Sequence, residues 1–417
     1  MLHARQGLPE MTASCLRALA GRPNFLERVS MTDSDASPAA PPSNRYDRME
    51  WAGAFGDLGT LIPFIAAYIG VLGMDPFGIL FAFGLSMLVC GLYYRTPIPV
   101  QPMKAIGAAA SIQAVQTAVV TPGAVHAAAL ATGLVWLLLA LSGFMRHVAR
   151  WVPATVVYAI LLGLGVGFML QGVKMMHGDL LVALAAGAMA LALLRSRRLP
   201  AMFFLLLFGA ALGIWRQPAL LSELVSAPPS LRLPSWELGE LDWNQVFVAI
   251  VLLVLPQIPL TLGNAILAIS RENNRLFPER PVSESGIAFS TGLMNLFAGV
   301  SGGVPMCHGA GGMAGHVAFG ARTGGSVVIL GGLLLVLALF FSGTVVTLFQ
   351  LFPPAVLGVL LFITGLQLAV GNGQLPEART ERAVVLASAA VCIWNVAAGF
   401  LLGCALHYAA RRGWLRL

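Results

Sequence analysis

Charged side chains are scarce in this sequence. Lys and Arg number 25 and Asp and Glu number 18 among 417 residues, so 10% of the chain is charged and 58% is hydrophobic. Soluble domains carry roughly 25% charged residues. Apolar runs of membrane-spanning length recur from residue 52 to the end. The composition excludes an ordinary soluble domain and predicts an all-α polytopic membrane protein in a lipid bilayer.

Cysteine is scarce too. The five cysteines are odd in number, lie mostly inside hydrophobic segments, and show no metal-ligand or disulfide spacing. We therefore expect no metal site and no cofactor. The net charge of +7 comes from arginines that fall between apolar segments rather than on one face, which argues against a nucleic-acid partner. For want of a nucleophile–base pair, we expect the protein not to be an enzyme.

Residues 1–50 differ from the rest because they are polar and contain six arginines and a Ser/Pro/Ala run at 34–43. Arginine interrupts their apolar stretches, so no signal-peptide core is present. We expect a disordered cytoplasmic tail. Met1 and Met31 both remain open as the start of the protein.

From residue 51 the apolar segments can be counted, and they form two groups of seven. Their approximate bounds are 52–71, 76–94, 102–118, 124–143, 153–172, 178–194, 200–214, 245–268, 284–300, 305–319, 326–350, 354–371, 382–395 and 397–411. Arginines gather in every second connection, which predicts both termini on the cytoplasmic side of the inner (cell) membrane. The predicted organisation is a first seven-span repeat at 51–215, an extracytoplasmic linker at 216–243 and a second repeat at 244–417. An odd number of spans per half makes the halves inverted relative to each other.

Two short motifs support an internal duplication. Pro102-Met103 recurs as Pro305-Met306 at an offset of 203, and 57–60 (Asp-Leu-Gly-Thr) resembles 261–264 (Thr-Leu-Gly-Asn) at an offset of 204. Paired apolar segments interrupted by Pro and Gly at corresponding places in two halves are a pointer to a transporter binding site. Gly56, Gly59 and Pro63 further predict a broken span around residue 57.

The segment 97–107 predicts an anion site. Pro99 and Pro102 disfavour helix before residue 102, whereas proline is tolerated at a first helical position. We expect an extended piece over 97–101, a helix from Pro102 to about Thr117, and a matching half-helix from Pro305. The unpaired N–H groups and dipoles of the two starts supply about one positive charge together, and Lys104 supplies another. The total of about two positive charges matches the charge of a dianion.

Asp57 and Lys104 are the two ionisable groups at membrane depth in the first half, and such residues are functional candidates. A structural salt bridge between them is the alternative. Thr60, Gln101 and Gln257 either orient substrate oxygens or join helices. His308 is expected as a pocket donor, and Cys307 beside it cannot form a nucleophile–base pair unaided. The full set of expected substrate-binding residues is Asp57, Thr60, Gln101, Met103, Lys104, Gln257, Thr261, Asn264, Met306, Cys307, His308 and Gly309.

The core stretches of both halves resemble the MOT1 molybdate transporter family, relatives of the sulfate permease superfamily. The matching stretches are 55–60 with 62–63, 99–105, 257–265, and 303–312 with 319–324. The resemblance implies a seven-plus-seven inverted repeat with core and gate domains, oxyanion uptake, and dimerisation as a family expectation. Because the chain ends soon after the last apolar segment, we expect no C-terminal regulatory domain of the kind found in sulfate permeases.

The leading hypothesis is a secondary active transporter that imports a tetrahedral oxyanion, molybdate first and sulfate next, coupled to protons through Asp57. A nucleobase permease is disfavoured because span 8 carries no acid, and a divalent-metal carrier because the core offers one carboxylate. An oxyanion channel or sensor without coupled transport is the alternative from a different class. The sequence does not separate molybdate from sulfate or tungstate.

Overall fold

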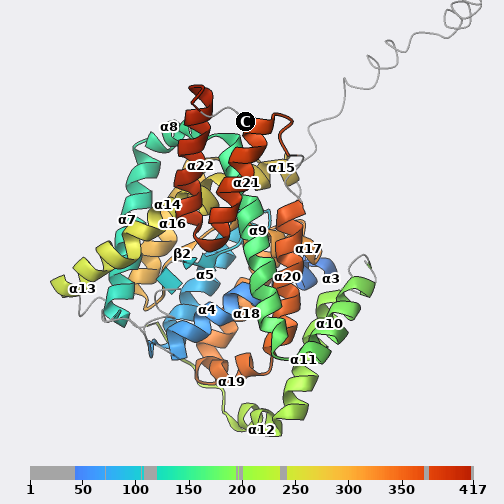
Figure 1. Cartoon of the computed structure of the whole chain (residues 1–417). Coiled ribbons are helices and arrows are strands. Elements are labelled where there is room, and N and C mark those ends of the chain that lie inside the picture. Colours follow the sequence, from blue (N-terminus) through green and yellow to red (C-terminus); the bar gives the residue numbers. More distant parts are fainter. Residues whose placement is uncertain are drawn as a thin grey trace, which may run out of the picture. The chain divides into compact units, whose positions relative to one another are not determined.

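The computed structural model describes residues 43–70, 72–104, 106–107, 120–193, 196, 201–234, 242–370 and 375–414. The expectations for residues 1–42 and for most of the helix after residue 107 lie outside these ranges. Residues 43–417 form one compact unit. Helices dominate its described part, and its strands are two short segments at the centre (Figure 1). A helical core of this kind agrees with the predicted all-α class.

The elements of the first half follow the apolar segments closely. They are α3 (Arg48–Ala54), the 3-10 turn η1 (Phe55–Asp57), α4 (Leu58–Gly70), α5 (Pro76–Tyr94), β1 (Gln101–Pro102), α7 (Pro122–Leu141), α8 (Phe144–Trp151), α9 (Ala154–His177), α10 (Leu180–Leu193), α11 (Ala201–Arg216) and α12 (Pro218–Ser226).

The second half begins with a helical run that changes type several times: α13 (Trp243–Val248), the π-helix η3 (Ala249–Val254), α14 (Leu255–Leu260), the π-helix η4 (Thr261–Ala268) and α15 (Ile269–Leu276). It continues with α16 (Glu284–Val300), β2 (Met306–Cys307), α17 (Ala310–Ala318), α18 (Gly325–Phe341), η5 (Ser342–Thr344), α19 (Val345–Gln350), α20 (Pro354–Val370), α21 (Arg379–Trp394) and α22 (Val396–Arg411).

Local sequence signals explain the sharpest helix ends. The side chain of Asp75 caps α5 by accepting a hydrogen bond from the Phe77 N–H, and Pro76 occupies the first helical position, where its missing N–H costs nothing. Ser283 caps α16 in the same way through the Gly286 N–H. Both helices therefore have the bounds that the sequence predicted.

The break predicted around Asp57 is wrong. The chain stays helical from Arg48 to Gly70 and only tightens into a 3-10 turn at η1, where the Leu58 N–H bonds to the Phe55 carbonyl. Pro63 lies inside α4 without ending it. Because a 3-10 turn still satisfies its backbone groups internally, the segment tolerates its glycines and proline without becoming extended.

The predicted helix starts at Pro102 and Pro305 are also wrong. Pro102 belongs to β1, and helix follows from Lys104, with the Gly107 N–H bonded to the Met103 carbonyl. In the second half, α17 starts at Ala310 rather than at Pro305. The reason is that the two segments pair with each other, so each stays extended a few residues longer.

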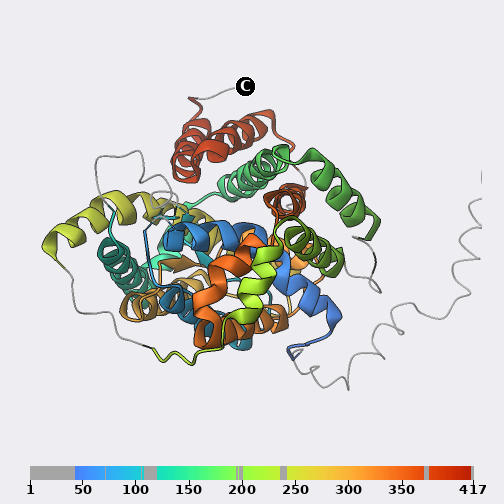
Figure 2. The same cartoon turned by 90° about the horizontal axis from the view of Figure 1, so that it is seen from below.

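Three pairs of helices pack against each other at close range: α5 with α18, α7 with α16, and α9 with α20 (Figure 1 and Figure 2). Glycines permit the contact. A Cβ on Gly84 of α5 would lie 2.9 Å from the Gly331 carbonyl of α18, and one on Gly133 of α7 would lie 3.0 Å from the Gly292 carbonyl of α16. Small residues at such crossings are typical of helix packing in membranes.

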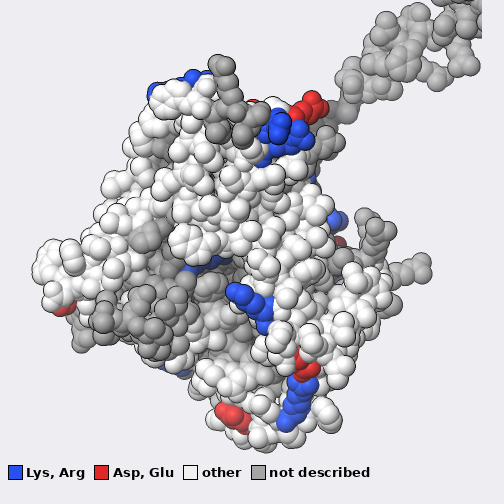
Figure 3. Space-filling view, in the orientation of Figure 1, with Lys and Arg blue, Asp and Glu red and all other residues white. Residues whose placement is uncertain are grey.

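Five described helices or helical runs are long and apolar enough to cross a membrane, and seven if each of two bent pairs is one span. The count of fourteen spans therefore stays a prediction. The visible face of the molecule is mostly uncharged, with acidic and basic side chains in a few small groups (Figure 3). These features are those of a multi-pass membrane protein.

Candidate functional site

The two halves of the chain meet in an antiparallel strand pair. β1 pairs with β2 so that Gln101 lies opposite Cys307 and Pro102 opposite Met306. The Met103 N–H donates to the Pro305 carbonyl over 2.9 Å. Irregular backbone at membrane depth needs such partners, because no water is present there to supply them.

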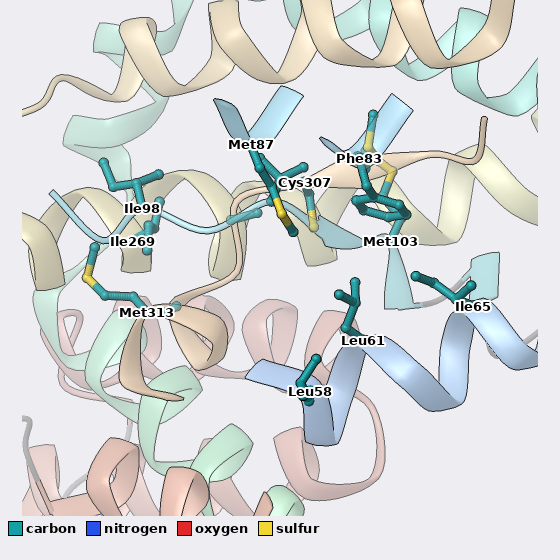
Figure 4. Close-up of a cluster of buried hydrophobic side chains, with 14 of the residues drawn as sticks. Leu58, Leu61, Ile65, Phe83, Met87, Ile98, Met103, Ile269, Cys307 and Met313 are labelled. Atoms are coloured by element: carbon teal, nitrogen blue, oxygen red, sulfur yellow. The ribbon is translucent and has the colours of Figure 1, made fainter. Parts of the chain in front are cut away.

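An amide on α16 holds the second strand in place. The Asn295 side chain donates to the Met306 carbonyl over 2.5 Å and accepts from the Met306 N–H over 2.8 Å. Sulfur-containing and aromatic side chains surround the pair: Phe83, Met87, Met103 and Cys307 gather there (Figure 4). The expected residues Met103, Met306 and Cys307 are thus brought together, and all are buried.

Asp57 is buried in a network of neutral donors. The Gln101 amide nitrogen donates to both Asp57 carboxylate oxygens, over 2.6 and 2.8 Å, and to Thr60 Oγ1 over 2.9 Å. Thr60 Oγ1 donates to Asp57 as well. The expected residues Asp57, Thr60 and Gln101 therefore form one unit that links the start of α4 to β1.

Two glycines at the start of α17 make room for this unit. A Cβ on Gly309 would lie 1.8 Å from Gln101 Oε1, and a Cβ on Gly312 would lie 2.8 Å from Asp57 Oδ2 and 2.8 Å from the Gln101 amide nitrogen. Real Cβ atoms do not approach this closely, so only glycine fits at either position without moving the network. Gly309 thus contacts the Gln101 side chain directly.

Lys104 carries a buried ammonium group. Its Nζ atom has no hydrogen-bond partner among the described residues and lies 4.5 Å from the centroid of the Phe168 ring of α9. No described carboxylate lies within 4.0 Å of it, so the structural salt bridge with Asp57 is absent. An unpaired buried cation costs several kcal/mol and calls for a functional explanation.

The Phe168 ring contacts both Lys104 and the start of α17. A Cβ on Gly311 of α17 would lie 2.3 Å from the Phe168 ring, so this ring packs directly on the first turn of α17. The Phe168 ring therefore contacts the start of α17 in the second half of the chain and Lys104 in the first half. A buried cation and a helix N-terminus together favour an anion, and the Phe168 face stabilises the cation.

Among the residues expected from the second half, Gln257 lies on α14, and Thr261 and Asn264 lie on η4. The Gln257 amide donates to Thr261 Oγ1 over 2.9 Å, and the buried Oδ1 of Asn264 has no described partner. η4 packs against α9, α16 and α17. A π-helix is uncommon and often marks a functional site.

His308 differs from the prediction because both of its ring nitrogens are occupied. Nδ1 lies 2.8 Å from the Pro99 carbonyl and Nε2 lies 2.8 Å from Ser290 Oγ, which in turn lies 2.7 Å from Tyr94 Oη. The ring therefore joins the extended segment before β1 to α5 and α16. In this arrangement it has no free ring nitrogen to offer a ligand.

Sequence reasoning missed Phe168, Asn295, Ser290 and Tyr94. Asn295 could have been noticed, because an amide inside an apolar segment needs a partner. Phe168 gives no such signal in the sequence. Within the described ranges no group of three or more His, Cys, Asp or Glu side chains is placed to hold a metal ion.

A helical membrane core with a buried cation near the first turn of α17 fits one class of protein, a transporter of small anions. Comparison with solved structures supports the fold. An overall structure of SLC26A9 aligns with a TM-score of 0.55 and 12% identity, over 86% of this chain and 64% of that one. The transmembrane domain of a cyanobacterium bicarbonate transporter, BicA, aligns with a TM-score of 0.53 and 17% identity, over 87% of this chain and 100% of that one.

The family follows from sequence. The family model described as molybdate transporter of the MFS superfamily matches residues 49–168 and 249–368, which is more than half of the chain. Molybdate transporter 2 of Arabidopsis thaliana is 30% identical over 408 residues, covering 85% of each chain. The chain belongs to this molybdate transporter family, which confirms the resemblance and the prediction that it is not an enzyme.

Proposed function

We propose that the protein is a secondary active transporter that imports molybdate. The observation that carries the proposal is the buried and unpaired ammonium of Lys104, which lies against Phe168 beside the first turn of α17. The names of the relatives support molybdate as the substrate. A dianion at this place would give the Lys104 ammonium group a partner.

The charge balance supports a dianion. The start of α17 supplies about half a positive charge, and a helix that continues from Lys104 would supply about another half. Lys104 adds a full positive charge, and an ionised Asp57 leaves about one in total. A bound dianion then makes the loaded site negative inside a medium of low dielectric constant, which opposes the conformational step of transport.

Protonation of Asp57 on substrate binding would restore neutrality, and this is the proposed basis of proton coupling. The Gln101 amide and the Thr60 hydroxyl donate hydrogen bonds to the Asp57 carboxylate. Asp57→Asn mimics the protonated group. We expect this variant to bind and exchange molybdate in proteoliposomes but to lose its response to an imposed pH gradient; retained pH-driven accumulation would rule the coupling out.

We further propose that the architecture is a seven-plus-seven inverted repeat with both termini cytoplasmic. The helix contacts support it. In the proposed repeat α5 corresponds to α16 and α18 corresponds to α7, and α5 packs on α18 just as α16 packs on α7. The glycines follow the same rule. Gly84 and Gly91 of α5 approach α18, and Gly292 and Gly299 of α16, with the same spacing of seven residues, approach α7.

Transport in proteoliposomes tests the proposed function. The purified protein should accumulate radiolabelled molybdate against its gradient, and unlabelled sulfate and tungstate should be added as competitors. Stronger competition by sulfate than by unlabelled molybdate would make the protein a sulfate transporter of the same fold. Flux that only dissipates a gradient would indicate a channel, and binding without flux would indicate a sensor.

A further inference from the structure

A cavity lies away from the site, between helices of the two halves. Its volume is about 290 Å³. One wall is the first two turns of α9, and the opposite wall is α15, with one residue from the connection between α20 and α21. The lining residues are Ala154, Thr155, Val157, Tyr158, Leu161, Arg271, Glu272, Arg275 and Pro376.

The same two helical runs border the site and this cavity. α15 continues η4 without a break, so Arg271 lies seven residues beyond Asn264, or roughly 10 Å along the axis at 1.5 Å per residue. On the other wall, Leu161 precedes Phe168 by seven residues and a similar distance. The interface between α9 and the η4–α15 run therefore leads along α9 from Phe168, which contacts Lys104, to the cavity.

An apolar contact joins α9 and η4 beside the cavity. A Cβ on Gly263 of η4 would lie 2.9 Å from Ile160 Cδ1 of α9 and 3.5 Å from the Phe400 ring of α22. Ile160 and Phe400 thus rest on the backbone of η4. This contact is apolar, and it lies one residue before Leu161 of the cavity lining.

The cavity carries an excess of positive charge. Arg275 is bound by Glu272, with Arg275 Nη2 2.7 Å from Glu272 Oε1 and Arg275 Nε 3.1 Å from Glu272 Oε2. Arg271 donates to the Val152 carbonyl over 3.2 Å, and no described carboxylate lies within 4.0 Å of it; Glu284 acts on it from farther away. No side chain caps the start of α9, which adds to the positive potential.

We propose that this cavity is an anion vestibule through which molybdate passes between the site and the cytoplasmic side, with Arg271 as its attracting charge. The proposal rests on the proposed function. A charged, low-dielectric cleft raises the local concentration of an oppositely charged ligand and the rate at which that ligand enters. Arg271 is thus a positioning residue for substrate entry from one face, and it does not touch substrate in the site itself.

Side-specific kinetics test the proposal. Molybdate uptake is measured in inside-out and right-side-out membrane vesicles that contain the full chain, in gluconate buffers of low and high ionic strength. Arg271→Gln keeps a donor for the Val152 carbonyl but removes the charge. We expect its KM to rise about three- to tenfold in inside-out vesicles at low ionic strength, and the difference to shrink near 1 M salt, where the screening length is about 3 Å.

Three controls make the outcome decisive. Arg271→Lys should restore most of the affinity, because it restores the charge. Arg379→Gln removes an exposed arginine at the start of α21, outside the cavity lining, and should leave KM unchanged. Right-side-out vesicles should show the wild-type KM for Arg271→Gln. The vestibule is overturned if the KM of Arg271→Gln changes equally in both orientations, if salt does not affect the change, or if KM does not change. A wild-type protein that takes up no molybdate overturns the proposed function instead.

Discussion

Replacing Lys104 with methionine removes the ammonium group and keeps a side chain of similar length. In the proposed transporter this cation is the main partner of a dianion. Two unit charges 4 Å apart interact by about 4 kcal/mol at an effective dielectric constant of 20. Counting one unit of anion charge alone, Lys104→Met should weaken molybdate binding by about 10³-fold, since 1.36 kcal/mol corresponds to a factor of ten.

The same substitution should stabilise the empty protein. Lys104 Nζ is buried without a hydrogen-bond partner among the described residues, and such a group costs roughly 1–3 kcal/mol or more. Methionine packs against Phe168 without that cost. The expected result is therefore a higher melting temperature in detergent for the variant without ligand, together with a lost response to molybdate.

Thermal unfolding with and without molybdate measures both effects at once. For the wild type, ligand at about 100 times its dissociation constant should add roughly 2.7 kcal/mol of stability. Lys104→Arg, which keeps the charge, is the matched control and should retain part of this shift. The reasoning is refuted if Lys104→Met still shows the wild-type response to molybdate, or if it melts below the wild type although it binds nothing.

Three other substitutions test particular contacts. Gly312→Ala places a methyl group against Asp57 and should abolish transport while the protein still inserts and folds, as checked by uptake and size-exclusion chromatography. Glu50→Ala removes the carboxylate that accepts three backbone N–H bonds near the start of α18. The free energy of unfolding should fall by about 3–6 kcal/mol, and the melting temperature should fall with it. The Arg216 guanidinium and a backbone N–H lower the pKa of Asp179. The stabilisation that ionised Asp179 gives the protein is therefore present above the unfolded pKa of about 4 and is lost as pH falls through the lower folded pKa. Asp179→Asn should therefore destabilise the protein at pH 7 and match the wild type in strong acid.

Segment positions were predictable from sequence because they depend on local chemistry. Apolar length, a capping Asp75 followed by Pro76, and Ser283 before α16 are all read within a few residues. The repeated motifs also singled out Asp57, Gln101 and Lys104 as residues of the protein core, whereas the helix starts that they predicted at Pro102 and Pro305 were wrong. These signals needed no knowledge of which helices touch.

The strand pair was not predictable in the same way. Pro102 fits a first helical position by itself, and only the backbone of 305–307, some 200 residues away, keeps it extended. The occupied nitrogens of His308 and the contact of Phe168 with Lys104 are likewise decided by helices distant in sequence. Long-range partners of this kind leave no pattern within a short window.

The pairing of β1 with β2 has a consequence for how the protein is made. Each half supplies one strand, so a first half that is inserted alone leaves the Met103 N–H without its partner, the Pro305 carbonyl. Ribosomes finish the first strand long before the second exists. During synthesis the early half must therefore hold its central backbone in some other way, through bound water or a loosely packed interior, until the later half arrives and closes the ladder.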